Sequence, residues 1–130
     1  QKEVADRIIA ETNTSRYGRL SILSNWKLNI KKIMDIKPQS FSPRPKVDST
    51  LLLFTPRENF FDLIDAKNLE MITRVFFSQR RKMLKKPFNQ IFDNAKEVSE
   101  KFSINLNLRP QNLEPEIYFK LVEEFENLRS

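Results

Sequence analysis

The sequence predicts an α+β fold that is mostly helical, with two helices and two strands followed by a small all-helical region. Three observations support this class. Apolar residues recur at helical spacing near the start of the chain, a nearly continuous apolar run at Val47–Phe54 is typical of a strand, and helical spacing returns after Asn68. The 130 residues are 39% hydrophobic and 31% charged, which suits one small globular domain or two pieces that share a core.

The first half is expected to carry the strands. Residues 1–13 predict a helix, and a polar break separates it from a second helix over Tyr17–Ile30. Ile30–Ile36 alternates apolar and polar residues, which is a weak strand pattern. Val47–Thr55 is the stronger strand, and its apolar run predicts burial on both faces.

The second half is expected to be helical. Pro56–Lys67 is too apolar for a free linker and should pack against the core. Asn68–Gln79 then predicts a helix with Leu69, Ile72 and Phe76 on one side. If this helix continues to Lys85, Met83 joins the apolar face. The opposite face would then carry the basic side chains of Arg74, Arg81 and Lys85.

Pro87 is expected to stop or kink that helix, because proline has no N–H and its ring clashes with the preceding turn. Phe88–Ser99 predicts a further helix, and Lys101–Leu108 is ambiguous. The last helix is expected over Glu114–Leu128, with its acids facing away from any nucleic acid. Those acids are Glu123, Glu124 and Glu126, and the side chains expected to be buried are Ile117, Leu121, Val122, Phe125 and Leu128.

The positive charge is concentrated in one segment. The net charge is +6, of which residues 1–56 carry ten bases minus five acids and residues 57–130 carry thirteen minus twelve. Arg74–Lys86 contains six bases and no acid. A basic helix face is most often only solvated, but such a density of like charge favours a surface that faces phosphate.

The composition excludes several classes of site. There is no Cys and no His, so thiol chemistry, zinc bound by Cys and an imidazole base are excluded. Gly18 is the only glycine, so no glycine-rich loop can hold a nucleotide or cofactor, and no metal site is expected. No apolar run is long enough for a membrane helix, and we expect a cytoplasmic protein.

Three stretches in order resemble one enzyme family. Phe41–Ser49 reads Phe-x-Pro-x-Pro-Lys-Val-Asp-Ser, and Phe77–Leu84 reads Phe-Ser-Gln-Arg-Arg-Lys-Met-Leu. With Gln1–Ile8 and Tyr17–Leu23, they resemble the C-terminal part of the ribosomal RNA small-subunit adenine dimethyltransferases. In that family the target adenine is methylated by S-adenosylmethionine, which is bound in a half that these motifs do not cover.

The resemblance implies a particular organisation. Residues 1–56 would be the C-terminal part of a Rossmann-like methyltransferase domain, with the two strands antiparallel at the edge of its sheet. Residues 57–130 would be a helical RNA-binding domain. The chain would be a fragment, inactive alone, of an enzyme that dimethylates small-subunit ribosomal RNA during ribosome biogenesis. The exposed sheet remnant would leave an open edge that favours a dimer.

The resemblance also implies site residues. Phe41 would stack on the target adenine, as the Phe of the family motif does. Arg80, Arg81 and Lys82 match the family's Arg-Arg-Lys, which lies against ribosomal RNA. Arg74, Lys85 and Lys86 are added from the basic segment alone. The expected partner is small-subunit ribosomal RNA, or the immature small ribosomal subunit. Arg16 and Arg19 either touch phosphate or lie on a solvated helix face, and the solvated face is favoured.

Other functions remain open on the sequence alone. The chain could be a stand-alone RNA-binding or ribosome-assembly module without catalysis. It could be a helical domain whose basic face binds an acidic protein, and salt-sensitive binding to protein but not RNA would then be expected. A transcription-factor relative within the same family is a third reading, which the bacterial-type Arg-Arg-Lys segment disfavours.

Overall fold

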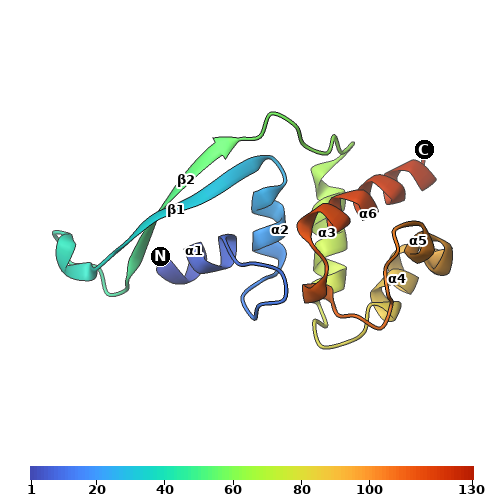
Figure 1. The fold of residues 1–130 in the computed structure, drawn as a ribbon, viewed down its shortest axis with the longest axis horizontal. Helices are drawn as coiled ribbons and strands as arrows, with labels where there is room; N and C mark the ends of the chain where they lie inside the picture. The colour runs from blue at the N-terminus through green and yellow to red at the C-terminus, as the bar shows by residue number, and fades with distance from the viewer.

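The computed structural model describes residues 1–130 and confirms the mostly helical α+β class. Figure 1 shows a long two-stranded hairpin at one end and a group of helices at the other. The α-helices are α1 (Lys2–Ile8), α2 (Arg19–Asn25), α3 (Ala66–Phe77), α4 (Lys85–Ile91), α5 (Ala95–Lys101) and α6 (Pro115–Leu128). The strands are β1 (Leu28–Ile36) and β2 (Ser49–Pro56), and short 3₁₀ turns occupy Pro38–Ser40 and Pro110–Asn112.

The two strands form an antiparallel pair with little cover. Their register runs from Leu28 opposite Pro56 to Ile36 opposite Ser49, with a bulge between Lys32 and Met34. The prediction that the second strand is buried on both faces is wrong. Leu51 is 47% exposed, Leu53 49% and Phe54 45%, because the sheet has no third strand. Only the short helix α1 packs appreciably on β2.

One hydrophobic core joins the two halves of the chain. Helix α2 packs against both α3 and α6, and Tyr17, just before α2, is buried with the side chains of those helices. The Tyr17 hydroxyl donates a hydrogen bond to the carbonyl of Leu113. Trp26 at the end of α2 donates through Nε1 to the Phe61 carbonyl at 2.6 Å, which fixes the linker as expected. The boundary at residue 57 therefore lies within a shared core and stays a prediction.

Helix α6 supplies both apolar and polar contacts. Leu121, Val122 and Phe125 are buried as predicted, but Leu128 is 53% exposed because it lies in the last turn. Glu126, one of the acids expected to face away from any nucleic acid, is buried in the protein, since only 7% of the residue is exposed.

The Glu126 carboxylate holds the start of α3. It accepts hydrogen bonds from the backbone N–H groups of Ile64 at 2.9 Å and Asp65 at 3.0 Å, and from Asn68 Nδ2 at 2.8 Å. Burial raises the pKa of this carboxyl, but the hydrogen bonds from Asn68, Ile64 and Asp65 together outweigh burial and leave its pKa below the ordinary value. Asp65 also caps α3 by accepting from the N–H of Lys67.

The chain between α3 and α4 departs from the sequence prediction. Leu69, Ile72 and Phe76 are buried on α3 as expected, but the helix ends at Phe77 and does not reach Lys85. Met83 is therefore 47% exposed, away from that apolar face. Arg74, Arg81 and Lys85 likewise do not share one helix face.

Pro87 does not end a helix; it lies buried in the first turn of a new one, where an N–H has no partner to lose. The helix predicted over Phe88–Ser99 is two helices, α4 and α5, because the chain turns at Phe92. None of the helices is both long and apolar enough to cross a lipid bilayer.

Candidate RNA-binding surface

Residues 79–86, which connect α3 to α4 and include the first two residues of α4, are here called the basic turn. Leu84 at its centre is fully buried, and the N–H groups of Leu84 and Lys85 donate at 2.8 and 3.2 Å to carbonyls of the segment after α5. From the end of that segment, Arg109 Nε donates to the Arg81 carbonyl at 2.9 Å. These hydrogen bonds fix the backbone of the basic turn, and the side chains of Arg81, Lys82, Lys85 and Lys86 are exposed on it.

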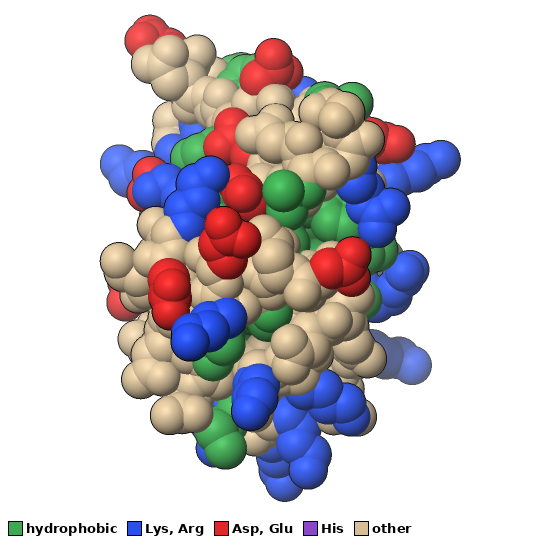
Figure 2. All heavy atoms as spheres, turned by 90° about the vertical axis from the view of Figure 1, so that its right-hand side faces the viewer, with side chains coloured by type: hydrophobic (Ala, Val, Ile, Leu, Met, Phe, Trp, Pro, Cys, Tyr) green, Lys and Arg blue, Asp and Glu red, His purple; other side chains and the backbone are tan.

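Three lysines of the basic turn share one shallow groove. Lys82, Lys85 and Lys86 are exposed and line a hollow of about 550 Å³. The other residues that line this groove are Met83, Asn89 and Gln90, and none of them is acidic. Figure 2 views the end of the molecule that is on the right in Figure 1, and Lys and Arg side chains gather along its lower edge, the level of the α3–α4 connection.

The charges of this segment are not neutralised within the chain. Lys2, Lys32, Lys101 and Lys120 each pair with a carboxylate, and Arg7 pairs with Glu3. None of the six bases between Arg74 and Lys86 makes an ion pair. Unpaired like charges around one groove create a positive potential that attracts a polyanion.

The structure divides the sequence-predicted bases into three groups. Lys82, Lys85 and Lys86 line the groove, and Lys86 Nζ also donates to the side chain of Gln79 at 3.1 Å. Arg74 on α3 and Arg81 on the basic turn are exposed but do not line it. Arg80 is half-buried, and its side chain turns inward to the carbonyl of Tyr17.

Two groove residues were not anticipated from the sequence. Asn89 and Gln90 present amide groups beside the lysines. Their spacing could have indicated this position, since Asn89 and Gln90 follow Lys85 and Lys86 by four residues, which is about one helical turn and places them on the same face. Amides of this kind donate hydrogen bonds to phosphate and sugar oxygens.

Phe41 lies far from the basic turn. Figure 1 places the connection between β1 and β2 at the left end of the molecule, opposite the helices. Phe41 follows the 3₁₀ turn Pro38–Ser40, its N–H donates to the Pro38 carbonyl at 3.2 Å, and the residue is 41% exposed. No aromatic ring of the chain pairs with it, so its ring is free to contact a flat ligand.

Arg19 is engaged within the protein. Its Nε donates to Thr73 Oγ1 at 3.4 Å and its Nη2 to the Glu70 carbonyl at 3.1 Å, so it ties α2 to α3. Arg16 is exposed.

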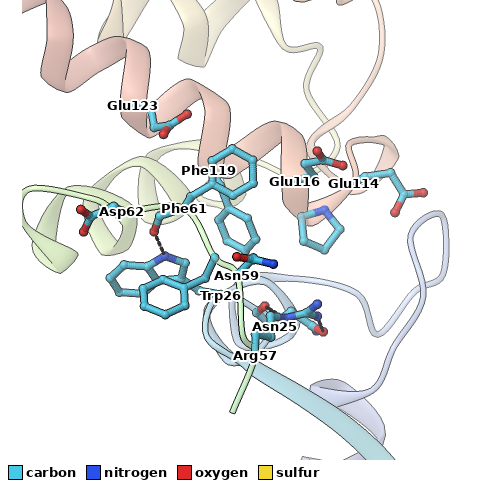
Figure 3. A pocket seen from close by; sticks show the side chains of 12 residues that line it. Asn25, Trp26, Arg57, Asn59, Phe61, Asp62, Glu114, Glu116, Phe119 and Glu123 are labelled. Atoms are coloured by element: carbon cyan, nitrogen blue, oxygen red, sulfur yellow. Dashed lines mark hydrogen bonds between the residues drawn. The ribbon is translucent and has the colours of Figure 1, made fainter. Parts of the chain in front are cut away.

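A larger hollow of about 730 Å³ has the opposite charge. Figure 3 shows it between the linker after β2 and the start of α6, with the Trp26–Phe61 hydrogen bond on one side. Four of its lining residues are acidic, namely Asp62, Glu114, Glu116 and Glu123. Its one base, Arg57, donates to carbonyls of Asn25 and Leu28 at 2.9 and 3.0 Å. Such a lining repels phosphate, which leaves the groove of the basic turn as the candidate surface.

The one glycine of the chain does not open onto a cavity. Gly18 is the N-cap of α2, and a Cβ added there would meet Arg80 and Phe77 at 4.0 Å rather than open onto a cradle. No cluster of three or more side chains suited to hold a metal ion occurs in residues 1–130. The chemistry available here is recognition: a cationic groove at one end and an exposed aromatic ring at the other.

Comparison with known proteins places the chain. The family model described as "Ribosomal RNA adenine dimethylase" matches residues 1–127. The chain belongs to this family. A Ribosomal RNA small subunit methyltransferase A from Pelagibacter ubique is 81% identical over 129 residues, which is 99% of this chain and 49% of that protein. The protein of the same name from Prochlorococcus marinus is 41% identical over 127 residues, 95% of this chain and 46% of its own length.

Solved structures of methyltransferases share the fold. A dimethyladenosine transferase from Plasmodium falciparum superposes with a TM-score of 0.77 at 26% identity, over 98% of this chain and 55% of that one. The 23S rRNA methyltransferase ErmE has a TM-score of 0.57 at 17% identity, over 88% of this chain and 50% of its own, which concerns the fold alone. The chain thus spans about half the length of the adenine dimethylase relatives it matches.

Proposed function

We propose that the chain is the C-terminal part of an S-adenosylmethionine-dependent enzyme that dimethylates adenines of small-subunit ribosomal RNA. The observation that carries this proposal is the family match over residues 1–127, together with 81% identity to a protein named small subunit methyltransferase A. The basic turn then docks the enzyme on the immature small subunit in the cytoplasm. The chain alone is inactive, because it spans only about half the length of the relatives it matches.

The two halves have different roles in this proposal. Residues 1–56 are the end of a Rossmann-like methyltransferase domain, whose remaining strands pair along the free edge of the β1–β2 sheet and whose other elements cover its exposed faces. The exposure of Leu51, Leu53 and Phe54 supports this, since such side chains are normally covered. In the isolated chain the same surface pairs two copies, which light scattering on a size-exclusion column would detect. Residues 57–130 form the RNA-binding domain.

Phe41 is proposed to hold the target base. The exocyclic amine of adenine is a weak nucleophile, because its lone pair is delocalised into the ring. The base must leave its helix and lie flat in the site before methyl transfer. S-adenosylmethionine supplies an electrophilic methyl group. An exposed ring such as Phe41 contributes roughly 1–3 kcal/mol by stacking on the base.

The lysines of the groove are proposed to contact phosphate. Lys82, Lys85 and Lys86 are exposed and unpaired, and the amides of Asn89 and Gln90 beside them donate hydrogen bonds. Such contacts fix the position of the enzyme and carry little sequence information. Arg81 and Arg74 extend the positive surface beyond the groove.

The test reverses the groove charge in the whole enzyme. Lys82→Glu, Lys85→Glu and Lys86→Glu together should abolish binding to the immature small subunit and leave binding of S-adenosylmethionine intact. A matched control reverses three exposed bases of the helical half outside the groove, Lys67, Lys96 and Arg129, for the same change in net charge. Equal losses in the two triple variants would mean that only net charge matters, and unchanged subunit binding would remove the docking role.

An RNA-binding module without catalysis is the second candidate. It is favoured by one observation: the groove and the hydrogen bonds that hold its backbone all lie between Arg81 and Arg109, within the helical half of the chain. The 130-residue chain should then bind a hairpin of small-subunit ribosomal RNA by itself, with affinity that falls steeply with salt. If the folded chain does not bind, the groove acts only alongside the rest of the enzyme.

A further inference from the structure

Arg80 differs from the other five bases of its segment. Its Nη2 donates to the carbonyl of Tyr17 at 3.0 Å, and its guanidinium carbon lies 5.8 Å from the ring centre of Phe77. The residue is half-buried, whereas Arg74, Arg81, Lys82, Lys85 and Lys86 are exposed. A single side chain thus reaches from the basic turn to the residue before the N-cap of α2.

The partners of Arg80 are themselves fixed. Tyr17 is 1% exposed, and its hydroxyl donates to the Leu113 carbonyl, so its backbone position is set by the core. Phe77 is the last residue of α3 and its ring packs against those of Tyr17 and Tyr118. Arg80 therefore connects the basic turn to two elements that the core holds in place.

The geometry suits a guanidinium and not an ammonium. A guanidinium is planar, so it can donate in its plane to a carbonyl while one face lies near an aromatic ring. A lysine ammonium is a point charge that is strongly hydrated, and it does not combine these two contacts in the same way. The identity of Arg80 is thus explained without any RNA contact.

We propose that Arg80 is a positioning residue, which fixes the orientation of the basic turn relative to α2, and that Arg81 and Lys82 are the members of the Arg-Arg-Lys run that contact phosphate. The proposal rests on the docking function above. It assigns different work to two adjacent arginines that the sequence does not distinguish. Arg80 acts through the placement of the groove lysines and adds no phosphate contact of its own.

The test compares the same substitutions at the two arginines in the 130-residue chain. Arg80→Lys keeps the charge but should lower the Tm by roughly 6–11 °C, since a charge-assisted hydrogen bond is lost. Arg81→Lys should leave the Tm unchanged. Binding of a small-subunit ribosomal RNA hairpin is measured at 10 °C and several salt concentrations, where every variant is folded.

The salt dependence separates positioning from phosphate contact. A phosphate contact contributes roughly 0.7–0.9 to the slope of log K against log salt. Arg81→Gln should reduce the slope by about that amount, whereas Arg80→Gln should weaken binding about three- to tenfold at every salt concentration with the slope unchanged. A reduced slope in Arg80→Gln with an unchanged Tm would show a phosphate contact. A lowered Tm with unchanged affinity would show a stabilising role only, and either result overturns the proposal.

Amide hydrogen exchange distinguishes this proposal from the docking function. Arg80→Lys should speed exchange of the Leu84 and Lys85 amides, which hold the basic turn to the segment after α5, and Arg81→Lys should not. If the wild-type chain binds no RNA, the docking function fails in the isolated chain. The exchange rates then decide the positioning role by themselves: equal protection in Arg80→Lys and wild type would refute it.

Discussion

Replacing Glu126 by Gln should destabilise the protein more than any other loss of one charge on α6. The carboxylate accepts hydrogen bonds from Ile64 N–H, Asp65 N–H and Asn68 Nδ2, at 2.8–3.0 Å. A Gln at this position keeps one carbonyl oxygen, but its NH₂ group faces a donor that is left without a partner. Hydrogen bonds to a charged group contribute about 1.5–3 kcal/mol each, so we expect a loss of about 2–3 kcal/mol.

The expected shift in melting temperature follows from chain length. Unfolding entropy is about 2.1 cal/mol/K per residue, or about 270 cal/mol/K for a chain of this size. A loss of about 2–3 kcal/mol thus lowers the Tm by about 7–11 °C at neutral pH. Glu124→Gln is the matched control: Glu124 makes one ion pair, at 2.7 Å with Lys101, and the two side chains are 12% and 58% exposed. Water screens this pair at the lysine, so its loss should lower the Tm less than the loss of the hydrogen bonds to Glu126.

The pH dependence gives a second, independent check. The folded pKa of Glu126 lies below its unfolded value of about 4.3, so its stabilisation is complete above that pH and is lost as pH falls through the folded pKa. Calorimetry from pH 3 to 8 should show a constant difference in Tm between wild type and Glu126→Gln above pH 6. This difference in Tm should become smaller below about pH 4. A difference that persists undiminished at pH 3, or equal Tm values for Glu126→Gln and Glu124→Gln, would contradict the reasoning.

Three further substitutions test the core and the groove. Leu84→Ala leaves a cavity at a fully buried position and should lower the free energy of unfolding, measured in urea, by about 2–5 kcal/mol. A smaller decrease would mean that Leu84 does not anchor the basic turn. Tyr17→Phe removes the bond to the Leu113 carbonyl and should cost about 1–2 kcal/mol, again in urea, and no change would argue against that bond. Lys85→Gln should reduce the salt slope of RNA binding by about 0.7–0.9, whereas Lys96→Gln, outside the groove, should not.

The sequence pattern predicts which face of a helix is buried, but it does not predict where one helix ends and the next begins. Leu69, Ile72 and Phe76 recur at helical spacing and are all buried, because that spacing places them on one face. The same count extended to Met83 fails because α3 ends at Phe77, and the N–H groups of Leu84 and Lys85 bond to the carbonyls of Leu108 and Leu106 instead of to a preceding helical turn. The chain instead breaks and starts α4 at Lys85, and the break moves the basic side chains off a single face.

The roles of individual charged residues depend on partners distant in sequence. Glu126 sits among other acids on α6 and reads as a solvated residue, but its partners lie about 60 residues earlier. Arg80 sits in a run of bases and reads as a phosphate contact, but its acceptor is the Tyr17 carbonyl, 63 residues away. Composition and spacing along a short segment carry no information on such pairings, so the basic segment could be found from sequence while its inward-facing member could not.

The support of α3 and of the basic turn by later segments sets an order of events during synthesis. Glu126, which accepts from the N–H groups of Ile64 and Asp65, lies 62 and 61 residues after them in the chain. At about 5–20 residues per second, it is synthesised roughly 3–12 s later. The basic turn likewise precedes Arg109, which holds its backbone. A nascent chain that has just released its lysines from the ribosome therefore carries them on an unfixed backbone. The groove takes shape only after Leu106, Leu108 and Arg109 have emerged, because these residues hold the backbone of the basic turn.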